Sequence, residues 1–436
     1  MIVQLKASKV AELTGGRLVG DDVVVDGVQF DSRSDVNGRL FVAVEAERDG
    51  HDFVSHAFSM GATCAMVSRE VDDTLGALVV VDDTNRAFTA LARDVRAHEM
   101  RDLAVVGVTG SVGKTSTKNF IAGALSSMAV SSSPKSFNNE LGVPFTLLNA
   151  PSDSEVVVVE MGMRGFGEIS HLCDIALPTI GVVTCVGEAH TARLGGIEGV
   201  ARAKAELVEA LPDEGVAVLN ADDERVLLMA EKCSGLVMTY GANADVSVTQ
   251  FETDTLGRSR FSFSSPWGSE EVRLQIPGAH MMQNALAAIA VGGSMGLSFE
   301  KICSGIENVA AEDHRMVVHQ LGSGSLLIDD CYNANPTSVA AALQTVANFD
   351  VDHKIAVLGE MAEVDQAERA HREIVRLAEQ LGVQVVAIAT DLYGVDVNHD
   401  LPEFVRSALA TGNTAVLVKG SRVVGLERLI DDLIAS

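Results

Sequence analysis

The sequence predicts an α/β protein built on parallel sheets, and three observations support this fold class. Short runs rich in valine, isoleucine and leucine recur along the chain, bounded by glycine or polar residues. Such continuous apolar runs are typical of strands buried on both faces of a parallel sheet. Helical patterns lie between many of them, for example at 337–349 and 367–381, and this alternation indicates α/β architecture. The length of 436 residues exceeds one ordinary core and predicts two or three domains.

Eight of these runs are predicted to be strands. They are residues 103–109, 155–162, 179–186, 215–220, 325–333, 354–361, 383–390 and 414–421. Residues 1 to about 84 look different, because they are punctuated by glycine and hold only short strand-like pieces. An amphipathic stretch at 85–100 then leads into the first strong strand, and a second boundary falls near 310–316. The predicted domains are therefore 1–84, 85–312 and 313–436.

Charge and cysteine usage exclude several classes of protein. The chain has 33 Lys and Arg against 60 Asp and Glu, a net charge of −27, whereas nucleic acids and anionic membranes require a basic face. The six cysteines are scattered without a C-x-x-C pair, which favours reduced thiols over disulfides or a zinc site. No signal peptide is evident, and no run approaches the roughly 20 apolar residues of a membrane helix. We expect a cytoplasmic enzyme that binds neither nucleic acid nor membrane and works as a monomer.

The stretch VVGVTGSVGKTSTKNF, residues 105–120, predicts a phosphate-binding loop between a strand and a helix. The usual pattern is G-x-x-x-x-G-K-[ST], but its first glycine would fall on Val108, so the loop has the shorter form G-x-x-G-K-T. Backbone N–H groups at a helix N-terminus, a lysine charge and a hydroxyl for magnesium are all retained. The residues predicted to bind ATP here are Gly110, Ser111, Val112, Gly113, Lys114, Thr115 and Ser116.

Two further residues follow predicted strands. Glu160 ends the run EVVVVE, and a carboxylate at the carboxyl end of a parallel strand points into the crevice where such sheets bind ligands. It is a candidate metal ligand, although an acid that merely ends a strand is the alternative. His190 lies in a loop after the next strand, where a single histidine is most often structural or solvated.

Lys204 interrupts an apolar stripe on a predicted helix within residues 196–215. Val200, Leu207, Val208 and Leu211 form this stripe at helical spacing. A lysine in apolar surroundings tends to lose its proton, and a neutral amine can add carbon dioxide to become a carbamate with two metal-binding oxygens. Spacing alone nevertheless favours a lysine that extends its charge to the helix edge.

Taken together, these residues resemble the Mur ligase family, ATP-dependent amide-forming enzymes of peptidoglycan precursor synthesis. The matching segments span nearly the whole chain. They are DSR…GRLFVAV…DGHDF (31–53), GVTGSVGKTSTK (107–118), SFNNELGVPFTLL (136–148), VVVVEMGM (156–163), VGEAHTARLGG (186–196), ARAKAEL (201–207), LNADDERV (219–226), PGAHMMQNALAAI (277–289), DDCYNANPTS (329–338), VLGEMAEV (357–364) and VKGSR (418–422).

The resemblance implies three domains: a small N-terminal α/β domain that binds a UDP-sugar, a central P-loop-type ATPase domain, and a C-terminal Rossmann-like domain that closes over the site. It also implies ATP and two Mg²⁺ ions. Thr115 and Glu160 would hold the first ion, while Glu160, His190 and a carbamylated Lys204 would hold the second. Lys114, Glu160, His190 and Lys204 are thus the predicted catalytic residues.

The signature Tyr332-Asn333-Ala334-Asn335-Pro336 refines the expected activity. Within the family it resembles the step that adds D-alanyl-D-alanine to UDP-N-acetylmuramoyl-tripeptide through an acyl phosphate. Sister enzymes that add the third residue usually carry Y-x-H-x-P there together with a D-N-P-R-type motif, which is not found in this sequence. The preceding step, which adds diaminopimelate or lysine, stays an alternative. From other classes, a folylpolyglutamate-synthase-like enzyme and a nucleotide-hydrolysing switch are weaker alternatives.

The resemblance also assigns binding roles. On the adenine, ribose and phosphate side it implies Asn284, Arg315 and Asp330. For the substrates it implies Ser32, Arg33, Phe41, Asp49, Gly50 and His51 at the UDP group, Asn138 and Asn139 near the sugar-peptide, and Asn333, Asn335, Lys419 and Arg422 at the dipeptide or domain interface. Turn formation is the alternative role for the asparagines. One departure is Met281, which replaces a polar residue of the family's G-x-H-N-x-x-N-A pattern, so an adenine contact is lost or moved to Gln283 or Asn284.

Overall fold

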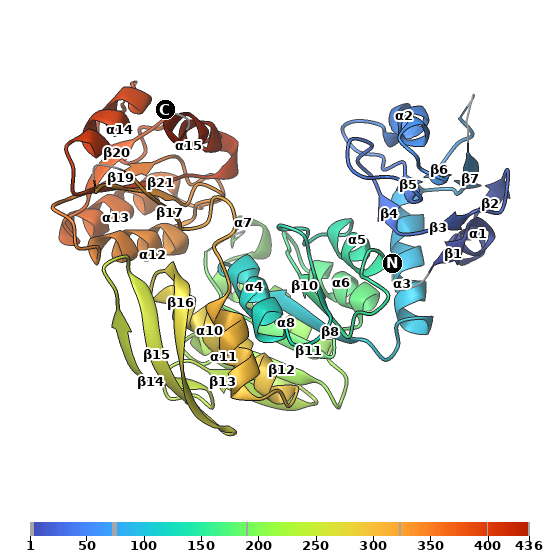
Figure 1. Ribbon diagram of the computed structural model, residues 1–436, viewed down its shortest axis with the longest axis horizontal. Helices are drawn as coiled ribbons and strands as arrows, with labels where there is room; N and C mark the ends of the chain where they lie inside the picture. Colours follow the sequence, from blue (N-terminus) through green and yellow to red (C-terminus); the bar gives the residue numbers. More distant parts are fainter. Residues whose placement is uncertain (1–3, 72–75, 189–190, 322–323, 399, 435–436) are drawn as a thin grey trace.

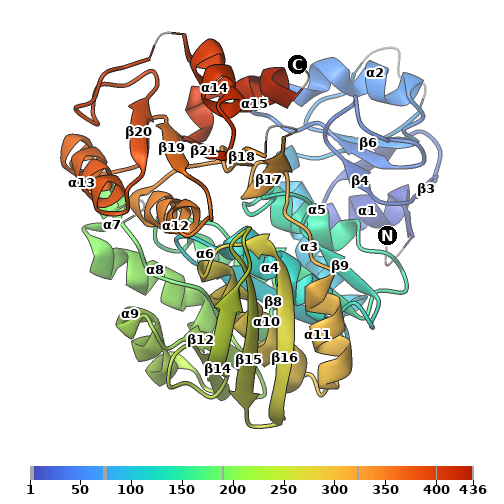
Figure 2. The same ribbon diagram turned by 60° about the vertical axis from the view of Figure 1, so that its left-hand side comes forward.

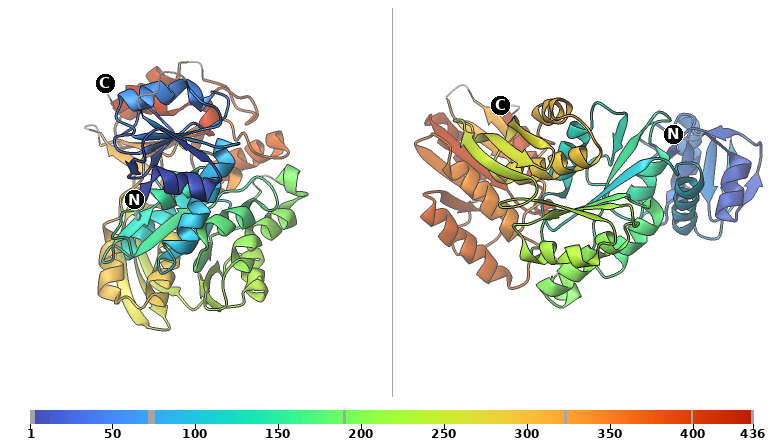
Figure 3. Two further views of the ribbon diagram at one scale, coloured as in Figure 1. Left: turned by 90° about the vertical axis from the view of Figure 1, so that its right-hand side faces the viewer. Right: turned by 90° about the horizontal axis from the view of Figure 1, so that it is seen from below.

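Three α/β units lie side by side in the computed structural model, which describes residues 4–71, 76–188, 191–321, 324–398 and 400–434. The central unit lies between the N-terminal unit, blue in Figure 1, and the C-terminal unit, orange to red. Figure 3, seen from below, places these two outer units at opposite ends of the molecule. Within the described ranges, no helix is both long and apolar enough to cross a membrane.

The N-terminal unit is built on a five-stranded sheet with the order β2-β7-β6-β5-β4. Strand β2 is antiparallel to β7, and the other neighbours are parallel. The strands are β2 (Arg17–Val19), β4 (Val28–Gln29), β5 (Leu40–Val42), β6 (Cys64–Val67) and β7 (Ala77–Val80). A separate antiparallel pair is formed by β1 (Leu5–Lys6) and β3 (Val24–Val25), and the helices are α1 (Ala7–Thr14), the 3₁₀ turn η1 (Gly50–Phe53) and α2 (Val54–Ser59).

Helix α3 (Thr84–His98) joins the first two units. Its N-cap is Asp83, whose carboxylate accepts a hydrogen bond from the Arg86 N–H at 2.9 Å. The helix packs on α1 and also on α5 (Gly142–Leu148) and α6 (Glu168–Ala176) of the central unit. Its buried Arg96 donates to the carbonyls of Ala176 and Leu177 at 2.8 and 3.0 Å. The predicted boundary at residue 84 therefore falls at the start of a helix that both units share.

The central unit holds a six-stranded, fully parallel sheet with the order β13-β12-β11-β8-β10-β9. Its strands are β8 (Ala104–Thr109), β9 (Val130–Ser132), β10 (Val156–Glu160), β11 (Ile180–Val183), β12 (Val216–Asn220) and β13 (Leu236–Tyr240). Besides α5 and α6, its helices are α4 (Lys114–Ala124), α7 (Thr191–Leu194), α8 (Ile197–Glu209), α9 (Glu224–Leu227), η2 (Leu228–Lys232), α10 (His280–Ser294) and α11 (Phe299–Glu307). Strands β8 and β10 are neighbours, so the loops at their carboxyl ends meet at one edge.

A three-stranded antiparallel sheet, absent from the sequence prediction, also belongs to this part of the chain (Figure 2). It consists of β14 (Ser247–Thr253), β15 (Arg258–Ser265) and β16 (Gly268–Pro277). In β15, Phe261 and Phe263 are buried and alternate with partly exposed residues. One face is therefore polar, and the continuous apolar runs that predicted the parallel strands do not occur here.

The C-terminal unit contains a five-stranded sheet with the order β17-β18-β21-β19-β20, in which only the β17 to β18 pairing is antiparallel among the described strands. Its strands are β17 (Val317–Gln320), β18 (Leu326–Asp329), β19 (His353–Leu358), β20 (Gln384–Ala387) and β21 (Thr414–Lys419). Its helices are α12 (Pro336–Ala347), α13 (Ala367–Gln380), α14 (Leu401–Ala410), η3 (Arg422–Val424) and α15 (Glu427–Ile434). All eight strands predicted from apolar runs are confirmed, and the boundary near 312 falls between α11 and β17.

Candidate active site

The phosphate loop between β8 and α4 requires two glycines. Gly110 has φ of 154°, and a Cβ there would lie 1.8 Å from the hydroxyl oxygen of Thr184. Gly113 has φ of 82°, in the left-handed region, and comes directly before the helix. The Lys114 ammonium donates to the Gly110 carbonyl at 2.8 Å, so it folds back over the loop. Burial lowers the pKa of Lys114, and the Glu160 carboxylate opposes this shift. Bound phosphate would favour its charged form in the same way.

The end of β11 fixes the other side of this loop. The Ser111 N–H donates to the carbonyl of Cys185 at 2.9 Å, and the Thr184 hydroxyl donates to the carbonyl of Val112 at 2.6 Å. The N–H of Gly187 donates to the Ser111 hydroxyl oxygen at 2.8 Å. The loop is therefore held in place by neighbouring backbone, which is the preorganisation that anion binding requires.

Glu160 is the best-oriented acid of the site. Its side chain is 1 % exposed; Thr115 donates its hydroxyl to Oε2 at 2.8 Å, and Asn138 donates its amide to Oε1 at 2.7 Å. The alternative, an acid that only ends a strand, does not account for two side chains that converge on it. The Thr115 and Glu160 oxygens also suit Mg²⁺, because neighbouring ligands of an octahedron with bonds of about 2.0–2.1 Å lie about 2.9 Å apart.

Lys204 lies on α8 with only 3 % of its surface exposed. The interpretation that this side chain extends its charge to the helix edge is therefore wrong, because the stripe around Lys204 is covered by neighbouring elements. Burial, and secondarily the charge of Lys114, lower its pKa to about 7. A largely neutral amine near physiological pH is the form that reacts with carbon dioxide. His190, the predicted partner of Lys204, lies outside the described residues.

A cavity of about 560 Å³ extends from the phosphate loop toward α10 and the C-terminal unit. Asn284 is buried beneath the loop, where its Oδ1 accepts from the Thr117 hydroxyl at 3.1 Å and its amide lies 3.5 Å from the sulfur of Met281. Gln283 lies on the cavity wall and donates to the Asp222 carboxylate at 2.6 Å. Its Oε1 is buried and has no hydrogen-bond partner in the described part of the chain. The buried side-chain polar atom of this helix that lacks a partner among the described residues is thus Gln283 Oε1, whereas the Asn284 amide contacts Met281.

The C-terminal unit lines the opposite wall with a connected set of side chains. Lys419 donates to the carboxylate of Asp330 at 2.6 Å and to the carbonyl of Asn333 at 2.9 Å. The guanidinium of Arg315 lies 4.0 Å from the ring centre of Tyr332, and that of Arg422 lies 5.5 Å from it. All six residues line the same cavity. The Tyr332 hydroxyl also contacts the Ser136 hydroxyl of the central unit.

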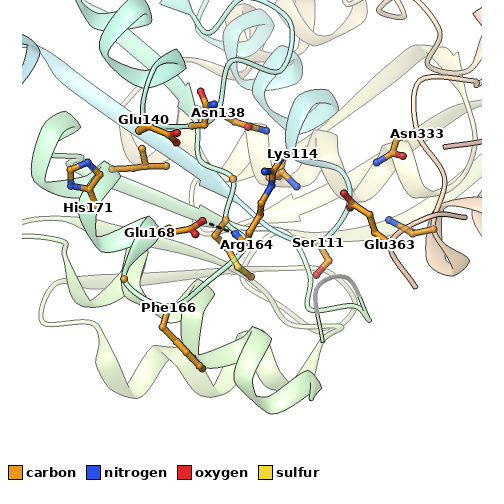
Figure 4. A pocket seen from close by; sticks show the side chains of 16 residues that line it. Ser111, Lys114, Asn138, Glu140, Arg164, Phe166, Glu168, His171, Asn333 and Glu363 are labelled. Atoms are coloured by element: carbon orange, nitrogen blue, oxygen red, sulfur yellow. Dashed lines mark hydrogen bonds between the residues drawn. The ribbon is translucent and has the colours of Figure 1, made fainter. Parts of the chain in front are cut away.

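A second cavity of about 640 Å³ shares lining residues with the first, and Figure 4 shows the side chains around it. Its walls combine Lys114, Asn138 and Glu140 of the central unit with Asn333 and Glu363 of the C-terminal unit. Ser111, Lys114, Asn138, Arg164, Asn333 and Asn335 line both cavities. One ligand can therefore meet another directly over the phosphate loop.

Two predicted substrate asparagines have structural roles. Asn139 accepts hydrogen bonds from the N–H groups of Leu141 and Gly142 at the start of α5. Asn335 is the N-cap of α12 and forms a reciprocal capping box with Ser338. Turn formation accounts for these side-chain hydrogen bonds, although both residues also line the second cavity.

The residues predicted at the UDP group all belong to the N-terminal unit. Ser32 is buried, and the exposed Arg33 pairs with Asp31 at 2.7 Å. Asp49 accepts from His51 Nδ1 at 2.6 Å, and Gly50 lies where a Cβ would come within 2.6 Å of the Val44 nitrogen.

The prediction that the Phe41 side chain contacts the UDP group needs correction. It is 1 % exposed and packs in the core of the N-terminal unit, so its ring is covered by other side chains. The residues that line the two cavities come from the central and C-terminal units.

Many further residues line the cavities although the sequence assigned no role to them, and four of these are notable for their polar side chains. They are Arg164, His280, Tyr332 and Glu363. His280, Tyr332 and Glu363 lie inside the family motifs PGAHMMQN, CYNANP and GEMAEV, respectively. Their place in these motifs could have identified them as site residues. Arg164 follows the end of VVVVEMGM directly and had no such signal.

Comparisons with known proteins agree with this architecture. Residues 108–292 match the Mur ligase middle domain, and residues 314–422 match the Mur ligase, glutamate ligase domain. The UDP-N-acetylmuramoyl-tripeptide–D-alanyl-D-alanine ligase of Escherichia coli strain K12 is 33 % identical over 448 residues, with 98 % of each chain covered.

Solved structures give the same result. The crystal structure of MurF from Acinetobacter baumannii superposes with a TM-score of 0.90 at 30 % identity, covering 100 % of this chain and 99 % of that one. MurF ligase from Thermotoga maritima in complex with ADP has a TM-score of 0.81 at 26 % identity, covering 94 % and 97 %. Since similarity in sequence and in fold extends over nearly the whole length, the chain belongs to the Mur ligase family.

Proposed function

We propose that this chain uses ATP to join D-alanyl-D-alanine to UDP-N-acetylmuramoyl-tripeptide. The relatives described above carry this activity in their names, and one of the solved structures holds ADP. The observation that carries the proposal is the position of Lys114, which lines both cavities beside the buried carboxylate of Glu160. This arrangement suits transfer of a phosphoryl group from a nucleotide in one cavity to an acceptor in the other.

The nucleotide would occupy the cavity of about 560 Å³, with its phosphates on Gly110 to Ser116. Asn284 would support the loop from below, while the unpartnered Gln283 Oε1 suits the exocyclic amine of adenine. Arg315 and Asp330 line the wall that the ribose and phosphates would face. The sugar-peptide and the dipeptide would then share the second cavity, near Asn138, Asn333 and Glu363.

Two magnesium ions fit the donors of the site. Thr115 and Glu160 would hold the first, and Glu160, His190 and a carbamylated Lys204 the second. Mg²⁺, when bound, neutralises phosphate charge that opposes attack by a carboxylate. The buried Lys204 supports the carbamate, because its pKa of about 7 leaves much of the amine neutral. Such a carbamate would add an oxygen-donor anion to a region that also contains Lys114.

The reaction then takes two steps. The terminal carboxylate of the tripeptide attacks the γ-phosphorus of ATP, ADP leaves, and an acyl phosphate forms. The free amine of the dipeptide attacks the acyl carbon, loses a proton and expels phosphate, leaving the new amide. Lys114 contributes positive charge to the transferring phosphoryl group. Water competes with the amine for the acyl phosphate, so the site must be closed during the reaction.

Three domains would divide this work. Residues 1–84 would bind the UDP group through Ser32, Arg33 and the loop of Asp49, Gly50 and His51; residues 85–312 would bind ATP; and residues 313–436 would form the lid. Contacts such as Ser136 with Tyr332 and Thr191 with Asp365 already join the last two. The six free cysteines support a reducing compartment such as the cytoplasm.

Acceptor-dependent phosphate release tests the proposal. The purified protein is incubated with ATP, Mg²⁺ and UDP-N-acetylmuramoyl-tripeptide, with and without D-alanyl-D-alanine. We expect phosphate release that depends on the dipeptide, with one dipeptide added to the sugar-peptide by mass. Turnover only with the dipeptide precursor plus diaminopimelate or lysine would move the assignment to the preceding step. Hydrolysis of ATP that is indifferent to both acceptors would refute a ligase and support a nucleotide switch.

A further inference from the structure

A histidine, a carboxylate and a thiol converge where the central unit connects to the C-terminal one. His314 lies in the linker between α11 and β17, whereas Asp329 ends β18 and Cys331 follows it. His314 Nδ1 lies 2.8 Å from Asp329 Oδ2 and 3.6 Å from Cys331 Sγ. The three potential ligand atoms all lie within 4.8 Å of one another. No role in the ligase reaction proposed above uses any of these side chains.

The spacing suits a tetrahedral ion. With Zn–N bonds of about 2.0–2.1 Å and Zn–S bonds of about 2.3 Å, tetrahedral angles place nitrogen and sulfur about 3.5 Å apart. His314 Nδ1 and Cys331 Sγ already have this separation. Nitrogen and carboxylate oxygen would be separated by about 3.3 Å, so the 2.8 Å hydrogen bond between His314 and Asp329 must lengthen by about half an ångström. Such a change needs only a small rotation of the imidazole ring.

The exposure of these three side chains and the charge of Asp329 also suit binding of a divalent ion. The side chain of His314 is 26 % exposed, whereas that of Asp329 is 4 % exposed and Cys331 is buried. An ion would therefore enter beside the imidazole and leave a fourth position for water. On binding, a divalent ion would replace the proton of the Cys331 thiol, and this proton would pass to solvent.

The backbone of the linker around His314 is constrained, so binding at this cluster would affect the neighbouring nucleotide cavity. His314 and Met316 both have positive φ, 62° and 55°, and the carbonyl of His314 accepts from the Tyr332 N–H at 3.0 Å. Between them, Arg315 stacks on the Tyr332 ring in the nucleotide cavity. A ligand on His314 would therefore fix the backbone directly before an arginine that faces the nucleotide cavity.

We propose that His314, Asp329 and Cys331 form a binding site for a borderline-soft divalent ion such as Zn²⁺, and that the bound ion slows the ligase by holding the interdomain linker in one conformation. The mixed nitrogen, oxygen and sulfur donors select against Mg²⁺, which prefers oxygen ligands alone. The site is separate from the magnesium ligands named above and goes beyond the proposed function. The alternative role for the cluster is a hydrogen bond from His314 to Asp329 with no metal.

Cobalt absorption spectroscopy tests the site without reference to activity. The full-length protein is titrated with Co²⁺, and we expect one equivalent to produce a thiolate-to-cobalt charge-transfer band that added Zn²⁺ abolishes. Cys331→Ala should remove the band, and His314→Gln should weaken binding by roughly tenfold or more. Cys303→Ala is the matched control, since Cys303 is also a buried free thiol, and should keep the band. Absence of the band, or its persistence in Cys331→Ala, would overturn the proposal.

Inhibition by Zn²⁺ tests the consequence. In excess Mg²⁺, micromolar Zn²⁺ should slow dipeptide-dependent phosphate release by the unmodified protein at least about tenfold more than release by Cys331→Ala. Equal inhibition of both proteins would place the effect at another metal site and refute the linker mechanism. If neither protein turned over these substrates, the proposed function would fail, while the cobalt spectrum would still decide the metal site.

Discussion

The ammonium of Lys114 lowers the pKa of Lys204, which lies buried on a different helix. Burial lowers the pKa of both lysines, but the Glu160 carboxylate opposes the shift at Lys114, whereas the charge of Lys114 adds to the shift at Lys204. Burial is the larger cause of the shift in Lys204. The difference between the two residues is created by the fold and leads to the first two predictions.

The activity should fall as pH decreases through about 7. Lys204 has a folded pKa of about 7 against an ordinary value of 10.5, so it is neutral above pH 7 and protonated below it. Only the neutral amine adds carbon dioxide. Rates measured between pH 6 and 9 in buffers with and without bicarbonate should show bicarbonate activation that is lost on the acid side. Mass spectrometry that finds no carbon dioxide on Lys204 under any of these conditions would contradict the carbamate.

Replacement of Lys204 by methionine should separate stability from activity. The unfolded state binds more protons at this site between pH 7 and pH 10.5, so the lysine costs stability that is recovered as pH rises through that window. Lys204→Met should therefore be at least as stable as the unmodified protein at pH 7 but lose at least about a hundredfold in rate. Urea unfolding and phosphate release measure the two effects. Partial rescue by a small carboxylate such as formate would support the missing anion, and a fully active variant would exclude any role for Lys204.

Asn138 and Asn139 are adjacent, yet their variants should behave differently. Asn138→Ala removes the amide that orients Glu160 and should lower kcat by about 10–100-fold with little change in stability. Asn139→Ala removes the side-chain oxygen that accepts from the Leu141 and Gly142 N–H groups at the start of α5 and should cost about 1 kcal/mol of unfolding free energy. Steady-state kinetics and urea unfolding on the pair test both. A raised KM for the sugar-peptide in Asn139→Ala would restore its predicted role in substrate binding.

Tyr332 should contribute to closure of the C-terminal unit through its hydroxyl and its ring. Tyr332→Phe removes the contact with Ser136 and should reduce kcat/KM by up to about tenfold, because one hydrogen bond contributes about 1 kcal/mol. Tyr332→Leu also removes the surface under Arg315 and should reduce it further. Scattering measured with and without ligands would show whether closure changes. Equal kinetics for both variants would mean that the ring has no role.

Asn149 should stabilise the contact between the N-terminal and central units. It accepts from the Val28 N–H at 3.0 Å, donates to the Val28 carbonyl at 3.1 Å and accepts from Arg39 at 2.9 Å. Asn149→Ala should cost about 1–3 kcal/mol of unfolding free energy, because these polar groups lose their partner. An unchanged urea midpoint would show that water replaces the asparagine without cost.

Sequence patterns predicted the parallel sheets well for a physical reason. A strand covered by helices on both faces must be apolar along its whole length, so β8, β10 and β21 are visible as uninterrupted runs. The antiparallel strand β15 alternates instead and was missed. The phosphate loop was predictable because its glycines and lysine are adjacent in sequence.

Long-range geometry explains what the sequence did not settle. Whether Lys204 reaches solvent depends on elements that cover α8, and spacing along one helix does not contain that information. In the same way, Asn138 binds Glu160 while Asn139 accepts from backbone N–H groups at the start of α5, although the two residues have the same type and adjacent positions. The cluster of His314 and Cys331 arises because Tyr332 pairs with the linker backbone, a contact without a local sequence signal.

Transfer of oxygen from the substrate to phosphate tests the central claim most directly. UDP-N-acetylmuramoyl-tripeptide labelled with ¹⁸O in its terminal carboxylate is turned over with ATP and D-alanyl-D-alanine, and the released phosphate is analysed by mass. An acyl phosphate requires one labelled oxygen in each phosphate formed, in step with amide synthesis. Amide synthesis with unlabelled phosphate would contradict the proposed mechanism.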